Sequence, residues 1–190
     1  NSLALAFEII TSQTNQVPPT NTVAQKWLQI PDTSTNGLDV KATDPKILAD
    51  DFLCTKTGPI TNIHLWASWL EDLADTNAVF QLGLWTDVPA GGGQFSHPGD
   101  LLWIAYFTPG QYSYSFIPTN RQSFYDPNLG PTGILGSETN LWEYNFPIPT
   151  NAAGWQTNAH IYWLSVSVQS HLYFGWKTAL TNWNDDAVFG

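Results

Sequence analysis

Cationic side chains are scarce in this sequence. Its 190 residues include 6 Lys and Arg against 16 Asp and Glu, which gives a formal net charge of −10. A protein with this charge repels the phosphate backbone of nucleic acids and anionic lipid surfaces. Charged residues of both signs make up only 12% of the chain, and Thr, Asn, Ser and Gln take their place. The composition therefore argues against a nucleic-acid partner and is typical of exported β proteins.

Sulfur-containing residues and long apolar runs are also nearly absent. The single Cys54 excludes an internal disulfide framework and a multi-cysteine metal site, and its apolar neighbours favour a buried position. No apolar run approaches the roughly 20 residues that span a bilayer. The sequence contains no Met, even at its first position, as expected of an exported chain after processing. We therefore expect an extracellular or cell-surface protein without a membrane span.

Aromatic and turn-forming residues are abundant by contrast. The chain contains 10 Trp, 14 Gly and 13 Pro, and short β-type runs recur between Pro, Gly and Asn clusters. This pattern predicts an all-β fold, an antiparallel β-sandwich of jelly-roll type, in a domain that covers residues 26–190. The expected strands cover residues 27–30, 51–54, 60–70, 78–86, 101–107, 112–117, 140–146, 159–169, 172–177 and 187–189.

The first 25 residues differ from the rest. Large and smaller side chains alternate in residues 3–10. This alternation places four large apolar side chains on one face of a strand: Leu3, Leu5, Phe7 and Ile9. The next stretch, residues 11–25, is polar and contains Pro18-Pro19 without apolar periodicity, which predicts an extended linker. We therefore expect a detached N-terminal strand, joined by a linker to the sandwich.

Three short runs are distinctive: Ala-Asp-Asp-Phe at 49–52, Phe-Gly-Trp-Lys-Thr at 174–178 and Trp-Asn-Asp-Asp-Ala-Val-Phe at 183–189. Together with shorter runs from residue 26 to the end, they resemble an uncharacterised family of secreted bacterial β-domains that has no assigned activity. The resemblance implies an exported β-domain. It supplies no catalytic residue.

Sequence signatures of catalysis are missing. There is no Gly-x-Ser-x-Gly elbow, no His-Glu-x-x-His run, no phosphate-binding loop and no dinucleotide fingerprint. The four His residues do not occur at close metal-ligand spacing. Glu138 and Glu143, which flank a strand beside Trp142, are the one carboxylate pair worth testing for glycoside hydrolysis. We therefore expect that the protein is not an enzyme.

Two carboxylate doublets are candidate metal ligands. Asp50-Asp51 and Asp185-Asp186 lie near the two ends of the family-like region, and the first and last strands of a jelly roll are often neighbours. Oxygen ligands of this kind suit Ca²⁺, and Asn184 and Asp39 are further candidates. The alternative is that these side chains cap turns and accept bonds from backbone amides. A structural calcium ion is the one cofactor that the sequence suggests.

The N-terminal strand favours a structural subunit as the function. If its four apolar side chains enter the sheet of another copy, head-to-tail contacts build a homopolymeric fibre. Pairing of the strand with its own sandwich is the alternative. Our first hypothesis is therefore a non-catalytic extracellular subunit that donates this strand to its neighbour.

Carbohydrate binding is the second hypothesis. Trp142, Trp155 and Tyr125 lie in or beside expected loops, where aromatic rings can stack on the sugars of a polysaccharide. The same residues can instead fill the core of a wide sandwich. The sequence leaves both roles open.

Overall fold

The computed structural model describes residues 3–16, 19–149 and 151–190, without the side chains of 12–23 and 131. Strands dominate this part of the chain, with two short 3-10 helices, η1 (Leu70–Asp72) and η2 (Pro127–Thr132). The strands are β1 (Phe7–Gln16), β2 (Pro19–Gln29), β3 (Leu38–Lys41), β4 (Leu48–Leu53), β5 (Gly58–Pro59), β6 (Asn62–Trp69), β7 (Val79–Val88), β8 (His97–Phe107), β9 (Ser113–Tyr125), β10 (Ile134–Pro147), β11 (Trp155–Gln156), β12 (Ile161–Gln169), β13 (Phe174–Lys177) and β14 (Val188–Phe189).

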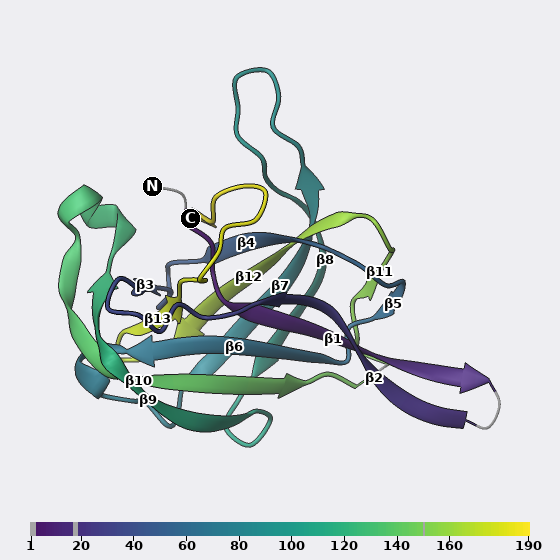
Figure 1. The fold of residues 1–190 in the computed structure, drawn as a ribbon, viewed down its shortest axis with the longest axis horizontal. Helices are drawn as coiled ribbons and strands as arrows, with labels where there is room; N and C mark the ends of the chain where they lie inside the picture. Colours follow the sequence, from purple (N-terminus) through teal and green to yellow (C-terminus); the bar gives the residue numbers. More distant parts are fainter. Residues whose placement is uncertain (1–2, 17–18, 150) are drawn as a thin grey trace.

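Two large sheets form the sandwich (Figure 1). The first has the strand order β10-β9-β3-β13-β6-β1-β2, and the second has the order β14-β4-β12-β7-β8. The strand pairs are antiparallel except for β3 and β9, which run parallel. The prediction of an all-β antiparallel sandwich is confirmed, whereas its jelly-roll type is not.

The core follows from side-chain alternation. In β6, Ile63, Leu65 and Ala67 point to one face and are fully buried, as the period of two requires. In β12 the facing set includes Leu164 and Val166, which are buried as well. The two sheets therefore enclose one continuous apolar core.

The first sheet also folds back on itself at one end. β10 pairs with β9 along one edge and with β6 along the other, and β9 in turn pairs with β3. The strands β6, β10, β9, β3 and β13 therefore close into a ring. This ring encloses a second, smaller interior beside the main core, which the sequence did not predict.

The N-terminal strand lies inside its own sheet. β1 is inserted between β2 and β6, where Phe7 is opposite Gln29 on one side and Leu65 on the other. Leu5, Phe7 and Ile9 are completely buried. The expectation of a detached strand is therefore wrong, because its apolar face is covered within the same chain, without the loss of freedom that association with a second copy entails.

The prediction of an extended linker over residues 11–25 is wrong as well. Apart from Val17 and Pro18, which lie outside the described residues, residues 11–25 belong to β1 and β2, and the hairpin extends past the last β1–β6 pair, Ile10 with Asn62 (Figure 1). The proposed domain boundary between residues 25 and 26 falls within β2. The N-terminal hairpin is therefore part of the sandwich.

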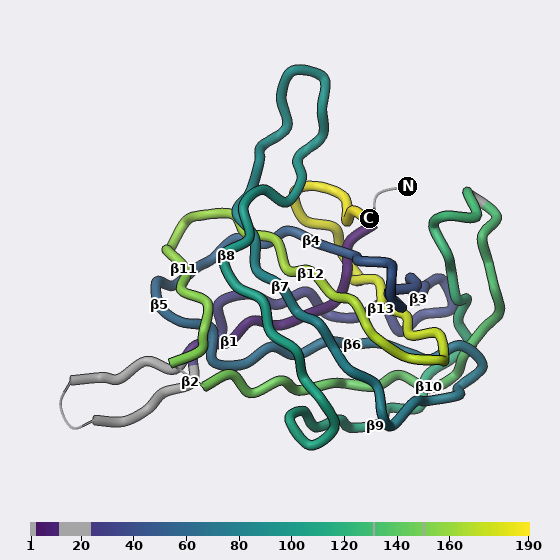
Figure 2. The backbone as a smooth tube through the Cα atoms, turned by 180° about the vertical axis from the view of Figure 1, so that it is seen from behind, coloured from purple at the N-terminus to yellow at the C-terminus, as the bar shows by residue number. Residues whose placement is uncertain are grey.

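The first described residues also pair with the end of the chain. Backbone hydrogen bonds of 2.7–2.8 Å run from Ala6 N to Lys177 O, from Ala179 N to Ala4 O and from Ala187 N to Leu3 O. Figure 2 shows this segment beside the C-terminus. The two ends of the chain therefore close the sandwich together.

Candidate functional site

The ring interior contains a buried ion pair. Lys177 on β13 is opposite Asp39 on β3, and Lys177 Nζ lies 2.7 Å from Asp39 Oδ2. Both side chains are 0% exposed, so neither charge is stabilised by water. A pair in this position depends on its own geometry and on its immediate neighbours.

Glu138 on β10 completes the cluster. It is 2% exposed, and burial, followed by a hydrogen bond to Asp39 and the charge of Asp39, raises the pKa of Glu138 to about 10. At neutral pH this carboxyl group is therefore protonated and can donate a hydrogen bond. Three buried oxygen atoms of the cluster have no hydrogen-bond partner in the described part of the chain other than one another: Asp39 Oδ1 and both carboxyl oxygens of Glu138.

An aromatic ring covers the cluster. Phe124 on β9 is opposite Asp39 and is fully buried. Gly175 makes room for it, since a Cβ atom at this position would lie 2.6 Å from Phe124 Cε2 and 2.9 Å from Asp39 Cβ. Phe124 therefore gives an apolar neighbour to three polar groups, an amine, a carboxylate and a carboxylic acid, while two other buried polar residues, Ser68 and Gln122, lie opposite Gly175 and Glu138.

Two members of this cluster were candidates from the sequence: Glu138, paired with Glu143, and Asp39, as a further ligand for calcium. In the structure Glu143 contacts His64 instead, with 3.2 Å between Oε1 and Nδ1. Lys177 could have been noticed in the sequence, because it is a lysine at the end of an apolar run, Phe-Gly-Trp-Lys, in a chain with few cations. All four residues of β13 are buried.

The two Asp doublets come near each other only in part. Within β4, Asp50 and Asp51 point to opposite faces, as neighbours in a strand do. Asp50 Oδ2 accepts from Leu5 N at 2.6 Å, whereas Asn184 Nδ2 donates to both Asp51 and Asp185. Asp50 is thus separated from the others, and no group of three or more acidic, His or Cys side chains suited to a metal occurs among the residues with described positions. Calcium binding stays an untested prediction.

Asp51 predicts a pH dependence. Burial, ahead of the charges of Asp185 and Asp87, raises the pKa of Asp51 to about 6. Because the folded state holds this proton more tightly than the unfolded state does, stability falls as the pH rises from about 4 to 6. We expect the free energy of unfolding of Asp51→Asn to decrease by roughly 2–3 kcal/mol less than that of the wild type over this pH range. Urea unfolding at pH 4, 5, 6 and 7 measures it.

The control for this prediction is Asp100→Asn, since Asp100 is exposed. This variant should keep the pH dependence of the wild type. Identical pH profiles for Asp51→Asn and the wild type would contradict the prediction.

The three candidate sugar-binding aromatics lie apart. Trp142 is half-buried and its ring contacts Tyr114 and Phe116 at 5.2 and 5.5 Å. Trp155 on β11 is 65% exposed. Tyr125, at the end of β9, lines a pocket. No ring contact joins the three among the described residues, so they do not form one platform.

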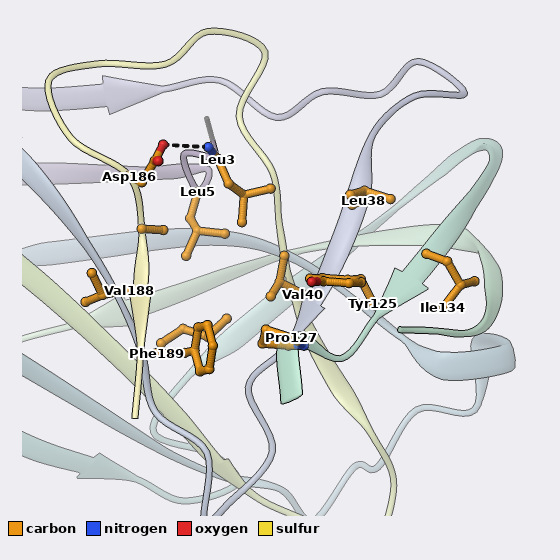
Figure 3. Close-up of a pocket in the computed structure, with 12 residues that line it drawn as sticks. Leu3, Leu5, Leu38, Val40, Tyr125, Pro127, Ile134, Asp186, Val188 and Phe189 are labelled. Atoms are coloured by element: carbon orange, nitrogen blue, oxygen red, sulfur yellow. Dashed lines mark hydrogen bonds between the residues drawn. The ribbon is translucent and has the colours of Figure 1, made fainter. Parts of the chain in front are cut away.

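Figure 3 shows the pocket beside Tyr125, a largely apolar space of about 360 Å³. Asp186 is its one ionisable carboxylate, and Asp186 Oδ1 accepts a hydrogen bond from Leu3 N at 2.9 Å. Residues that the sequence assigned to three different sites meet here: Leu3, Leu5, Tyr125 and Asp186.

A sequence profile described as a domain of unknown function, DUF7901, matches residues 25–190. The chain belongs to this family. The resemblance to an uncharacterised family is thereby confirmed, and secretion from bacteria stays a prediction. The DUF7901 match begins within β2, so β1 precedes it. Comparisons with curated proteins and with solved structures gave no match.

The DUF7901 domain has only short helices in the ranges described. None of them is long and apolar enough to cross a membrane.

Proposed function

We propose that this chain is a non-catalytic, extracellular structural subunit whose copies associate by strand addition at β8. The observation that supports it is the sequence of this strand from 101 to 107, Leu-Leu-Trp-Ile-Ala-Tyr-Phe, which has no charge, Pro or Gly. β8 is the last strand of its sheet (Figure 2). Four of its side chains are 39–53% exposed: Leu101, Leu102, Ile104 and Tyr106.

An edge of this kind is unusual in a monomer. Natural proteins protect edge strands with charges, Pro or bulges, because free N–H and C=O groups pair with other chains. Residues 101–107 have neither a charge nor a Pro to protect them, and the register shift in this stretch is confined to Leu102 near its start. A flanking groove runs between β8 and residues 147–149 and 152. A strand added here would bury apolar side chains as well as backbone groups.

Charge favours a second copy as the partner. With a net charge of −10, two copies repel each other over most of their surface. At β8 they meet through a neutral stretch, so that no like charges face each other across the new strand pair. A two-fold antiparallel contact uses the same patch on both copies.

This route differs from donation of the N-terminal strand. Donation requires that Leu5, Phe7 and Ile9 leave the core in which they are completely buried. Addition at β8 leaves each sandwich intact. We therefore retain strand addition and propose β8 as the contact.

Ile104→Lys is expected to prevent association. A charge in the centre of β8 must be desolvated if a second strand covers it. Light scattering coupled to size exclusion, over a range of protein concentrations, should show associated wild type and monomeric variant.

The control is Leu129→Lys, which places the same charge at an exposed leucine in η2 and should associate like the wild type. A monomeric wild type at the highest concentration tested, or the same behaviour of both variants, would contradict the proposal.

Carbohydrate binding is a second candidate, supported by the exposure of Trp155. A ring that is 65% exposed is free to stack on a sugar, and its truncation should change the free energy of unfolding by less than about 1 kcal/mol. We expect Trp155→Ala to remain stable and to lose any polysaccharide binding seen in a glycan screen.

Trp163→Ala is the matched stability variant, because Trp163 is fully buried and its loss should cost about 3–5 kcal/mol. A screen without a ligand, or binding that survives Trp155→Ala, would remove this candidate.

A further inference from the structure

The side chains of Lys177 and Asp39 are positioned so that they can react with each other. They face each other on adjacent strands, with Lys177 Nζ 2.7 Å from Asp39 Oδ2. A nitrogen nucleophile and a carboxyl carbon held at near-contact distance react as if at very high concentration. Both groups are 0% exposed, so that water does not compete for them.

We propose that Lys177 and Asp39 form an intramolecular isopeptide bond, with Glu138 as the group that transfers the proton. The amine of Lys177 must first lose its charge, and the nearest acceptor is the carboxylate of Asp39. Proton transfer within the pair gives a neutral amine and a neutral acid, the form in which the nitrogen has a lone pair for attack.

The reaction then follows the general course of acyl transfer. Lys177 Nζ attacks Asp39 Cγ, and the protonated carboxyl of Glu138 donates a hydrogen bond to the Asp39 oxygen on which negative charge develops. A C–N bond forms, and one C–O bond of Asp39 breaks. The departing oxygen carries two protons that originate from the Lys177 ammonium group, one transferred directly within the pair and one relayed through Glu138, and it leaves as water.

The balance is one ammonium and one carboxylate converted into one amide and one water, and Glu138 ends in its starting state. The product removes two opposite charges from a site where their desolvation is unfavourable. The cover provided by Phe124, which Gly175 permits, excludes the water that would reverse the reaction.

Another buried lysine shows what is special about this position. Lys26 is 1% exposed, but its Nζ donates to Gly58 O and Gln156 Oε1, neither of which belongs to a carboxyl group. Lys177 combines burial with a carboxylate and a carboxylic acid. The inference does not depend on association at β8.

Mass spectrometry of the denatured wild-type chain tests the proposal. We expect a mass one water molecule below that of the sequence, and a tryptic digest in which the peptides that contain Asp39 and Lys177 are joined. A chain of full mass, with cleavage after Lys177 and two separate peptides, would overturn the proposal. The wild-type protein alone gives this answer, so it does not depend on the folding of any variant.

Variants assign the roles. Lys177→Arg should have full mass, because the nucleophile is lost, and Glu138→Gln should have full mass because the side chain keeps its size but no longer transfers the proton. Asp39→Leu should also have full mass, because the carboxyl group that Lys177 attacks is lost. The control Glu143→Gln changes a carboxyl group on the same strand and should keep the wild-type mass. Loss of water in Glu138→Gln would overturn the role of Glu138.

Discussion

Replacement of Phe7 by alanine is expected to lower the free energy of unfolding by about 3–5 kcal/mol. Phe7 is completely buried in the strand that is inserted between β2 and β6. Its ring meets those of Phe52 and Trp176 edge-on, with centroids 5.6 and 5.8 Å apart. Because these partners belong to β4 and β13, the cavity would open between both sheets. Urea unfolding followed by Trp fluorescence measures the loss.

The control for this prediction is the next residue, Glu8→Gln. Glu8 points to the opposite face, where its Oε1 accepts a hydrogen bond from Gln25 Nε2 at 2.6 Å. Glutamine can keep this bond, so the change should stay within about 1 kcal/mol. If Phe7→Ala were as stable as Glu8→Gln, the N-terminal strand would not be part of the folded core in solution.

Loss of Lys177 is the second large effect that we expect. Lys177→Ala leaves Asp39 buried without its cation, and removal of one partner of a buried pair typically costs about 3–5 kcal/mol. The double variant Lys177→Met/Asp39→Leu, in which no charge is left unpaired, should recover a substantial part of this loss. Denaturant unfolding of Lys177→Met, Asp39→Leu and the double variant gives the coupling between the two residues.

Unfolding measurements on the same variants in a Glu138→Gln background separate the stabilisation by the ion pair from the stabilisation by the proposed isopeptide bond. This background should lack the isopeptide bond but keep the ion pair. A double variant that is destabilised by the sum of the two single effects would mean that Lys177 and Asp39 do not depend on each other.

Side-chain periodicity predicted the faces of strands but not their partners. The alternation in residues 63–69 correctly marks which side of β6 is buried. The alternation from Leu3 to Ile9 marks a buried face equally well, yet it is the same whether the strand enters its own sheet or that of another copy. The choice depends on β6, more than 50 residues later, and no local pattern contains that information.

The candidate sites show the same limit. That Asp50 and Asp51 point apart follows from the period of two, once residues 48–53 are known to be a strand. Lys177, Asp39 and Glu138 lie far apart in the sequence and meet only because β10 bends to close the ring. From the sequence Glu138 was therefore paired with its neighbour Glu143, which in the structure contacts His64.

The contacts between the two ends of the chain affect how it folds. Leu3, Ala4 and Ala6 bond to backbone atoms of residues from 177 to 187, so the core cannot be completed until residue 187 has been synthesised. During translation residues 3–10 emerge before residues 177–187 and cannot yet form these hydrogen bonds. Folds dominated by such long-range contacts form slowly. A nascent chain therefore exposes the apolar side chains of residues 3–10 until residue 187 has been added, and chaperones that hold extended apolar segments would act on them at that stage.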